Sequence, residues 1–133
     1  MITSVDSSVL LDILLNDPRF GARSLAALVQ CQNEGKVIIC EAVIAEISPA
    51  LSLQREVEEF LDDSGVEFIA ISRGASIEAG QMFSCYLKSG GKRGRVAADF
   101  LIGAHAKIQA ERLLTRDAGF YRNHFNGLKV ISP

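Results

Sequence analysis

Two acidic residues follow apolar segments that are typical of short strands. Asp6 comes directly after residues 1–5, and Asp117 comes directly after residues 112–116. In an open parallel sheet, functional side chains gather outside the carboxyl ends of the strands. The two carboxylates are therefore expected to converge on one rim if these two strands are neighbours.

Two further acidic residues lie in helical segments that have little other polar surface. Asp99 is the only carboxylate between Arg95 and Lys107, and Glu46 lies in the apolar segment Glu41–Ile47. A desolvated carboxylate needs a partner or a metal ion. Simpler interpretations stay open, because an acid in a first helical turn favours the helix dipole and a short helix exposes its polar side.

Four carboxylates in one place would repel one another and raise one another's pKa values. A divalent cation removes that repulsion, and a donor set made of oxygen atoms favours Mg²⁺ or Mn²⁺ over Zn²⁺. Such an ion activates water and stabilises charge on a phosphoryl group. The acidic residues therefore indicate a magnesium or manganese site suited to phosphoryl chemistry.

The other residues that bind metals are not arranged as a competing site. His105 and His124 do not have the spacing of a metal-binding pair, and His105 is interpreted as a satisfied side chain on a buried helix. The three cysteines are odd in number and lack C-x-x-C spacing, which argues against disulfides and a zinc site. Cys31, Cys40 and Cys85 are therefore interpreted as buried free thiols.

The elements that position the acids alternate between short apolar strands and helices. A chain of 133 residues with 48% apolar composition suits one domain, residues 1–133, with a sizeable core. Parallel pairing with both sheet faces covered is typical of such a pattern. We expect a three-layer α/β/α domain of about five strands, at residues 1–5, 36–40, 66–71, 112–116 and 128–131.

The net charge of −2 conceals two halves of opposite sign. Residues 1–67 hold 12 acidic and 4 basic residues, whereas residues 68–133 hold 4 acidic and 10 basic residues. Residues 88–95 form a Gly-rich basic segment just before Asp99. Such a segment is often only a solvated connection, but beside an acidic metal site it could attract an anionic partner such as RNA.

Four stretches resemble, in order and spacing, the acidic motifs of PIN-domain nucleases. Size and layout are most similar to the VapC type of toxin–antitoxin ribonuclease, and the resemblance covers essentially the whole chain. The stretches are Val5-Asp6-Ser7-Ser8-Val9-Leu10-Leu11, Glu46-Ile47, Asp99-Phe100-Leu101-Ile102-Gly103-Ala104-His105-Ala106 and Leu114-Thr115-Arg116-Asp117.

The resemblance implies a parallel five-stranded sheet with strand order 3-2-1-4-5. It also implies cleavage of RNA phosphodiesters by a water that Mg²⁺ or Mn²⁺ activates. Thr115 matches a hydroxyl commonly seen beside the last acid, while Ser8 stands where the family often has Asn. The residues that match the catalytic and metal-binding acids are Asp6, Glu46, Asp99 and Asp117.

Partners follow partly from the residues and partly from the resemblance. The basic side chains expected to contact RNA are Lys92, Arg93, Arg95 and Arg116, and none of them is taken from the family motif. The resemblance implies a small antitoxin that inserts a segment into the acidic groove, and a homodimer. A cytoplasmic location is expected, because there is no signal-peptide pattern and no transmembrane segment.

Two alternatives to a ribonuclease remain at this stage. A non-catalytic PIN-like module could bind RNA or a protein, although such a module has no reason to keep four repelling carboxylates. A phosphatase would need a second acid at the position of Ser8, and a receiver domain would need an Asp at the end of its central strand, where residues 70–72 have none. The sequence therefore favours the nuclease.

Overall fold

The computed structural model describes residues 1–92 and 96–133, and a parallel sheet lies at its centre. The described strands form one five-stranded sheet in the order β3-β2-β1-β4-β5, so the expected order is confirmed. β1 and β4 are neighbours, as convergence of Asp6 and Asp117 requires. The strands are β1 (Ile2–Val5), β2 (Lys36–Ile39), β3 (Glu67–Phe68), β4 (Arg112–Leu114) and β5 (Val130–Ile131).

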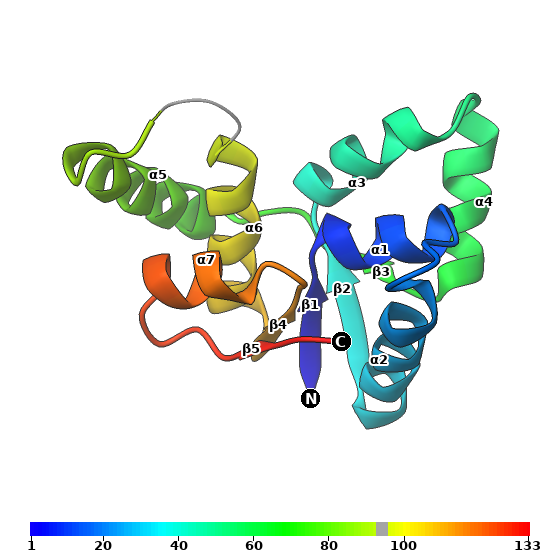
Figure 1. The fold of residues 1–133 in the computed structure, drawn as a ribbon. Coiled ribbons are helices and arrows are strands. Elements are labelled where there is room, and N and C mark those ends of the chain that lie inside the picture. Colours follow the sequence, from blue (N-terminus) through cyan, green and yellow to red (C-terminus); the bar gives the residue numbers. More distant parts are fainter. Residues whose placement is uncertain (93–95) are drawn as a thin grey trace.

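Helices cover both sides of the sheet in an α/β/α arrangement. In Figure 1, α5, α6 and α7 lie on the left and α1 to α4 lie on the right. A single 3-10 turn, Ser48–Ala50, follows α3. The helices are α1 (Ser7–Leu14), α2 (Gly21–Glu34), α3 (Glu41–Ile47), α4 (Gln54–Ser64), α5 (Arg73–Lys88), α6 (Val96–Gln109) and α7 (Ala118–His124).

The third strand is shorter than its apolar sequence predicts. Residues 66–71 were expected to be extended, but only Glu67–Phe68 pairs as a strand, at the edge of the sheet. The amide groups further along bond to side chains instead. The Ile71 amide donates to Glu41 Oε1 at 2.8 Å, and the Ser72 amide donates to Gln109 Oε1 at 2.9 Å. These hydrogen bonds to side chains take the place of further backbone hydrogen bonds between strands, and the strand ends here.

An aromatic cluster around Phe100 joins the three helices on the left of Figure 1. Phe100 is 1% exposed, and its ring centroid lies between 5.4 and 6.0 Å from those of its ring neighbours. Aromatic pairs at these separations contribute beyond their buried area. The neighbours, from α5, α7 and the residue after α7, are Phe83, Tyr86, Phe120, His124 and Phe125.

Gly103 allows Phe125 to pack against α6. A Cβ atom at Gly103 would lie 2.5 Å from the Phe125 ring, a distance that no folded protein tolerates without movement. Phe125 is itself 1% exposed and has little room to retreat. The small residue in this helix therefore lets the aromatic cluster close over the end of the sheet.

His105 is the satisfied buried histidine that the sequence predicts. It is fully buried, Nε2 donates to the Ile69 carbonyl at 2.9 Å, and Nδ1 lies 3.4 Å from Ser4 Oγ. Burial holds the pKa of the imidazole below its usual value. The neutral ring thus joins α6 to β1 and to the residue after β3.

The cysteine interpretation is correct at two of three positions. Cys31 and Cys40 are buried free thiols, but Cys85, on α5, is exposed. The sequence misled because Cys85 lies between apolar and aromatic residues of α5. Among the described residues, no helix combines the length and apolar character needed to cross a membrane.

Candidate carboxylate site

Asp6 forms the centre of the candidate site. It follows β1 and is 5% exposed, and its amide donates to the Leu114 carbonyl at 3.0 Å. Its Oδ2 atom accepts hydrogen bonds from Thr115 Oγ1 at 2.6 Å and from Ser8 Oγ at 3.2 Å. Burial nevertheless raises the pKa of the Asp6 carboxyl above its ordinary value. The carboxylate is oriented by hydroxyl groups, and burial disfavours its charged form.

Ser7 connects Asp6 to Glu46. The Ser7 hydroxyl donates to Glu46 Oε1 at 2.8 Å and also lies 3.3 Å from Asp6 Oδ1. Glu46 is exposed on α3, and this hydroxyl is what brings it beside the end of β1. Sequence reasoning singled out Ser8 and missed Ser7, because the partner of Ser7 lies 39 residues away along the chain.

Thr115 connects Asp6 to Asp117. The Thr115 side chain is fully buried, donates to Asp6, and accepts from the Asp117 amide at 2.9 Å. Asp117 is exposed and stands directly before α7. Asp6 and Asp117 therefore both lie at the carboxyl ends of the neighbouring strands β1 and β4. The positions of the two acids after these strands predict this arrangement.

Asp99 occupies the first turn of α6 and is 9% exposed. The interpretation that it is only a solvated acid at a helix start is therefore wrong. The next residue, Phe100, is 1% exposed, so this turn of α6 is buried at both positions. A carboxylate in that environment is retained only with polar partners.

Tyr121 places a buried phenol within reach of the negative charge of the four acids. Its side chain is fully buried on α7, and its hydroxyl has no hydrogen-bond partner within the described part of the chain. Burial raises the pKa of the Tyr121 phenol, and the negative charges of all four acids raise it further. No polar pattern in the sequence identifies this residue. The four acids in question are Asp6, Asp99, Glu46 and Asp117.

The donor set fits a hydrated, oxygen-preferring cation. Within residues 1–92 and 96–133, no group of three or more His, Cys, Asp or Glu side chains is arranged so that it could hold a metal ion. Mg²⁺, however, commonly binds one or two carboxylates and completes its shell with waters and substrate phosphates. Asp6 and Glu46, joined through Ser7, satisfy that smaller requirement.

The basic residues expected to contact RNA have different positions. Lys92 is exposed just beyond α5, whereas Arg93 and Arg95 lie outside the described residues. Arg116 is next to Asp117, and its guanidinium is paired with Asp12 at 2.6 and 2.9 Å. The RNA contacts of these four residues stay a prediction.

Comparisons with known proteins agree with this architecture. The family model described as PIN domain matches residues 4–126, a span that contains all four acids. A search of curated proteins returned no match.

Solved structures that contain similar chains include the following three. One is VapBC2 from Rickettsia felis bound to a DNA fragment from its promoter, with 20% identity and a TM-score of 0.75 over 100% of this chain and 99% of that chain. Another is VapBC-1 from nontypeable Haemophilus influenzae, with 17% identity and a TM-score of 0.72 over 99% and 98%. The third is FitAcB from Neisseria gonorrhoeae, with 23% identity and a TM-score of 0.68 over 98% and 96%. These likenesses agree with the fold, and on the family match the chain belongs to the PIN domain family.

Proposed function

We propose that this protein is a metal-dependent endoribonuclease and the toxin component of a toxin–antitoxin pair. One observation carries the catalytic part. The buried carboxylate of Asp6 is joined through Ser7 to Glu46 and through Thr115 to Asp117, in a chain of the PIN domain family. Acids concentrated at one edge of a sheet fit metal-assisted phosphodiester hydrolysis better than binding alone.

The side chains divide the work of the proposed reaction. Asp6 and Glu46 would hold a Mg²⁺ or Mn²⁺ ion, and Asp99 and Asp117 would add negative charge and acceptors for water. When bound, such an ion lowers the pKa of water and offsets charge on the phosphoryl group. Thr115 keeps Asp6 oriented, because its 2.6 Å hydrogen bond fixes one carboxylate oxygen.

The proposed substrate and partners rest on charge and on the similar structures. The residues proposed to attract the RNA backbone are Lys92, Arg93 and Arg95, in the half of the chain with net positive charge. The similar chains come from structures named as VapBC and FitAcB, which supports a small antitoxin as a partner. A homodimer acting in the cytoplasm completes the proposal.

Manganese should stabilise the folded protein and support RNA cleavage. At one hundred times its Kd, a ligand adds about 2.7 kcal/mol to the free energy of unfolding, which raises the Tm of a chain of this size by about 10 °C. Thermal denaturation during a Mn²⁺ titration measures this shift, and gel analysis of a labelled RNA measures cleavage. Chelation should reverse both. Absence of both effects would favour the non-catalytic binding module.

Replacement of Ser7 by alanine should weaken cleavage without unfolding the protein. Ser7→Ala removes the hydroxyl that holds Glu46 beside Asp6, and losses of this kind cost about 10- to 100-fold in metal affinity or activity. Single-turnover cleavage at varied Mn²⁺ concentration measures the change. Ser76→Ala, which removes an exposed hydroxyl on α5, is the matched control. Equal rates for the two variants would show that Glu46 does not need Ser7.

A further inference from the structure

Asp12 holds Arg116 through a two-pronged ion pair beside the carboxylate site. Arg116 Nε donates to Asp12 Oδ2 at 2.6 Å, and Arg116 Nη2 donates to Asp12 Oδ1 at 2.9 Å. Asp12 is 3% exposed, and Ser24 Oγ donates to its Oδ2 atom at 2.7 Å. An arginine that meets a carboxylate with two parallel bonds is fixed in direction as well as in charge.

The Arg116 guanidinium also lies against an aromatic ring. Its central carbon lies 4.2 Å from the centroid of the Phe20 ring, within the range of a cation–π contact. One face of the group is therefore against an aromatic ring, and two of its nitrogen atoms are on Asp12. A side chain held in this way is poorly placed to follow the phosphates of an RNA strand.

One face of α1 holds both the side chain and the main chain of Arg116. Ser8 and Asp12 are four residues apart, so they lie on the same side of that helix. Asp12 binds the guanidinium, and Ser8 Oγ accepts a hydrogen bond from the Arg116 amide at 3.2 Å. The segment that leaves β4 is thus fastened to the helix that leaves β1.

Arg116 stands between two residues of the carboxylate site. Thr115 donates to Asp6 and accepts from the Asp117 amide, so any shift of Arg116 moves both contacts. We propose that the Asp12–Arg116 pair is a positioning clamp that sets Thr115 and Asp117 for metal binding, and that Arg116 is a positioning residue and not an RNA contact. This inference rests on the proposed function.

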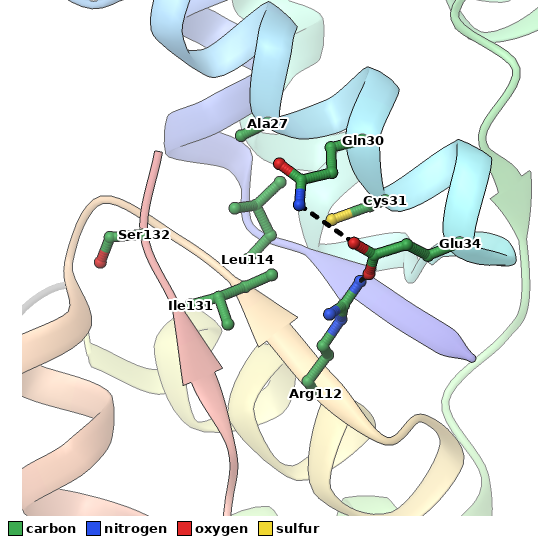
Figure 2. Close-up of a pocket in the computed structure, with 8 residues that line it drawn as sticks. All are labelled: Ala27, Gln30, Cys31, Glu34, Arg112, Leu114, Ile131 and Ser132. Carbon is green, nitrogen blue, oxygen red and sulfur yellow. Dashed lines mark hydrogen bonds and ion pairs between the residues drawn. The ribbon is translucent and has the colours of Figure 1, made fainter.

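The chain offers a matched ion pair at the other end of β4. Arg112 is the first residue of that strand; its Nε donates to Thr3 Oγ1 at 2.8 Å, and its Nη2 bonds to Glu34 on α2. Figure 2 shows this pair beside the small cavity that it lines. It also ties β4 to a helix, but it lies at the amino end of the strand, away from Asp6.

The test compares Asp12→Asn with Glu34→Gln in the full chain. Amide hydrogen exchange, measured without metal, reports whether the Arg116 and Asp117 amides lose protection relative to distant amides. Calorimetric titration with Mn²⁺ reports metal affinity. Asp12→Asn should raise exchange at both amides and weaken Mn²⁺ binding about 10- to 100-fold, and Glu34→Gln should change neither. Unaltered exchange and affinity in folded Asp12→Asn protein overturn the proposal.

A second variant, Arg116→Lys, tests the clamp independently of whether Asp12→Asn folds. Arg116→Lys keeps the charge but cannot form both bonds, so it should reproduce the loss of Mn²⁺ affinity even if Asp12→Asn does not fold. Binding of a labelled RNA without divalent ions tests the competing role. If Arg116→Lys weakens RNA binding and keeps Mn²⁺ affinity, Arg116 is an RNA contact and the clamp is wrong. If the wild-type chain binds no Mn²⁺, the proposed function fails, and the exchange data alone decide whether the clamp exists.

Discussion

Asp6→Asn should abolish RNA cleavage and, without metal, raise the Tm of the protein at neutral pH. The two effects have one cause. The Asp6 carboxylate is nearly buried, and burial raises its pKa above the ordinary value near 3.8, so the ionised form is unfavourable in the folded chain. Asparagine has almost the same shape, carries no charge, and cannot hold a metal ion as a carboxylate does.

The sign of the stability change depends on pH. Because the folded-state pKa of Asp6 is raised, its contribution to stability is fully present below about pH 3.8 and is lost as pH rises through the folded-state pKa. The Asn variant does not titrate there. Its gain in the free energy of unfolding should therefore be absent in acid and reach a plateau at neutral pH.

The loss of cleavage should be large. A metal supplies several kcal/mol of transition-state stabilisation, and a loss of about 4 kcal/mol corresponds to about a thousandfold in rate. Denaturation at several pH values and single-turnover cleavage measure the two effects. Persistent cleavage by purified Asp6→Asn protein would refute the assignment of Asp6 as a metal ligand.

Asp17 provides a control of opposite sign for the pH experiment. Its carboxylate accepts hydrogen bonds from the amides of Phe20 at 2.8 Å and Arg19 at 2.9 Å, and these bonds lower its pKa. Asp17→Asn should therefore reduce stability at neutral pH, and that loss should disappear as pH falls through the lowered pKa. If both variants shift stability in the same direction, burial is not the dominant influence on Asp6.

Phe100→Ala should cost about 3–5 kcal/mol of unfolding free energy. The ring is 1% exposed and is the shared neighbour of the aromatic cluster, so its removal leaves a cavity that rigid rings cannot fill. Urea denaturation measures the change. Ile77→Ala on α5, where the side chain is 55% exposed, should stay within about 0.5 kcal/mol of the wild-type value. A cost below about 1 kcal/mol for Phe100→Ala would mean that the cluster repacks.

The sequence predicted the parts of the site that depend on local pattern. Asp6 and Asp117 each follow an apolar run, so their position at strand ends required no knowledge of the fold. Asp99 and Glu46 were identified as acids in helical segments with little other polar surface, whereas the order of the strands and the match to the family's catalytic acids came from resemblance to a family. The apolar segment around Glu46 marked it as a candidate but did not indicate its hydrogen bond from Ser7, which lies 39 residues away along the chain.

The contacts that sequence reasoning missed join residues far apart in the chain. Asp12 looks like an ordinary polar residue of α1, yet it is buried because Arg116 reaches it from 104 positions away. Tyr121 looks like a core aromatic residue, and only the assembled fold places its hydroxyl among four charges. Local periodicity predicts neither the contact of Asp12 nor the surroundings of Tyr121, because both depend on which strands and helices meet in the fold.

Arg112, the first residue of β4, and Arg116, two residues beyond its end, affect the register in which this short strand pairs with β1. The strand has three residues, and sliding a strand by two residues returns every side chain to its original face, so the apolar pattern opposes such an error only weakly. Arg112 and Arg116 have separate carboxylate partners on α2 and α1. A slipped strand would leave both cations mismatched. The two ion pairs therefore favour the observed register of β4 against β1.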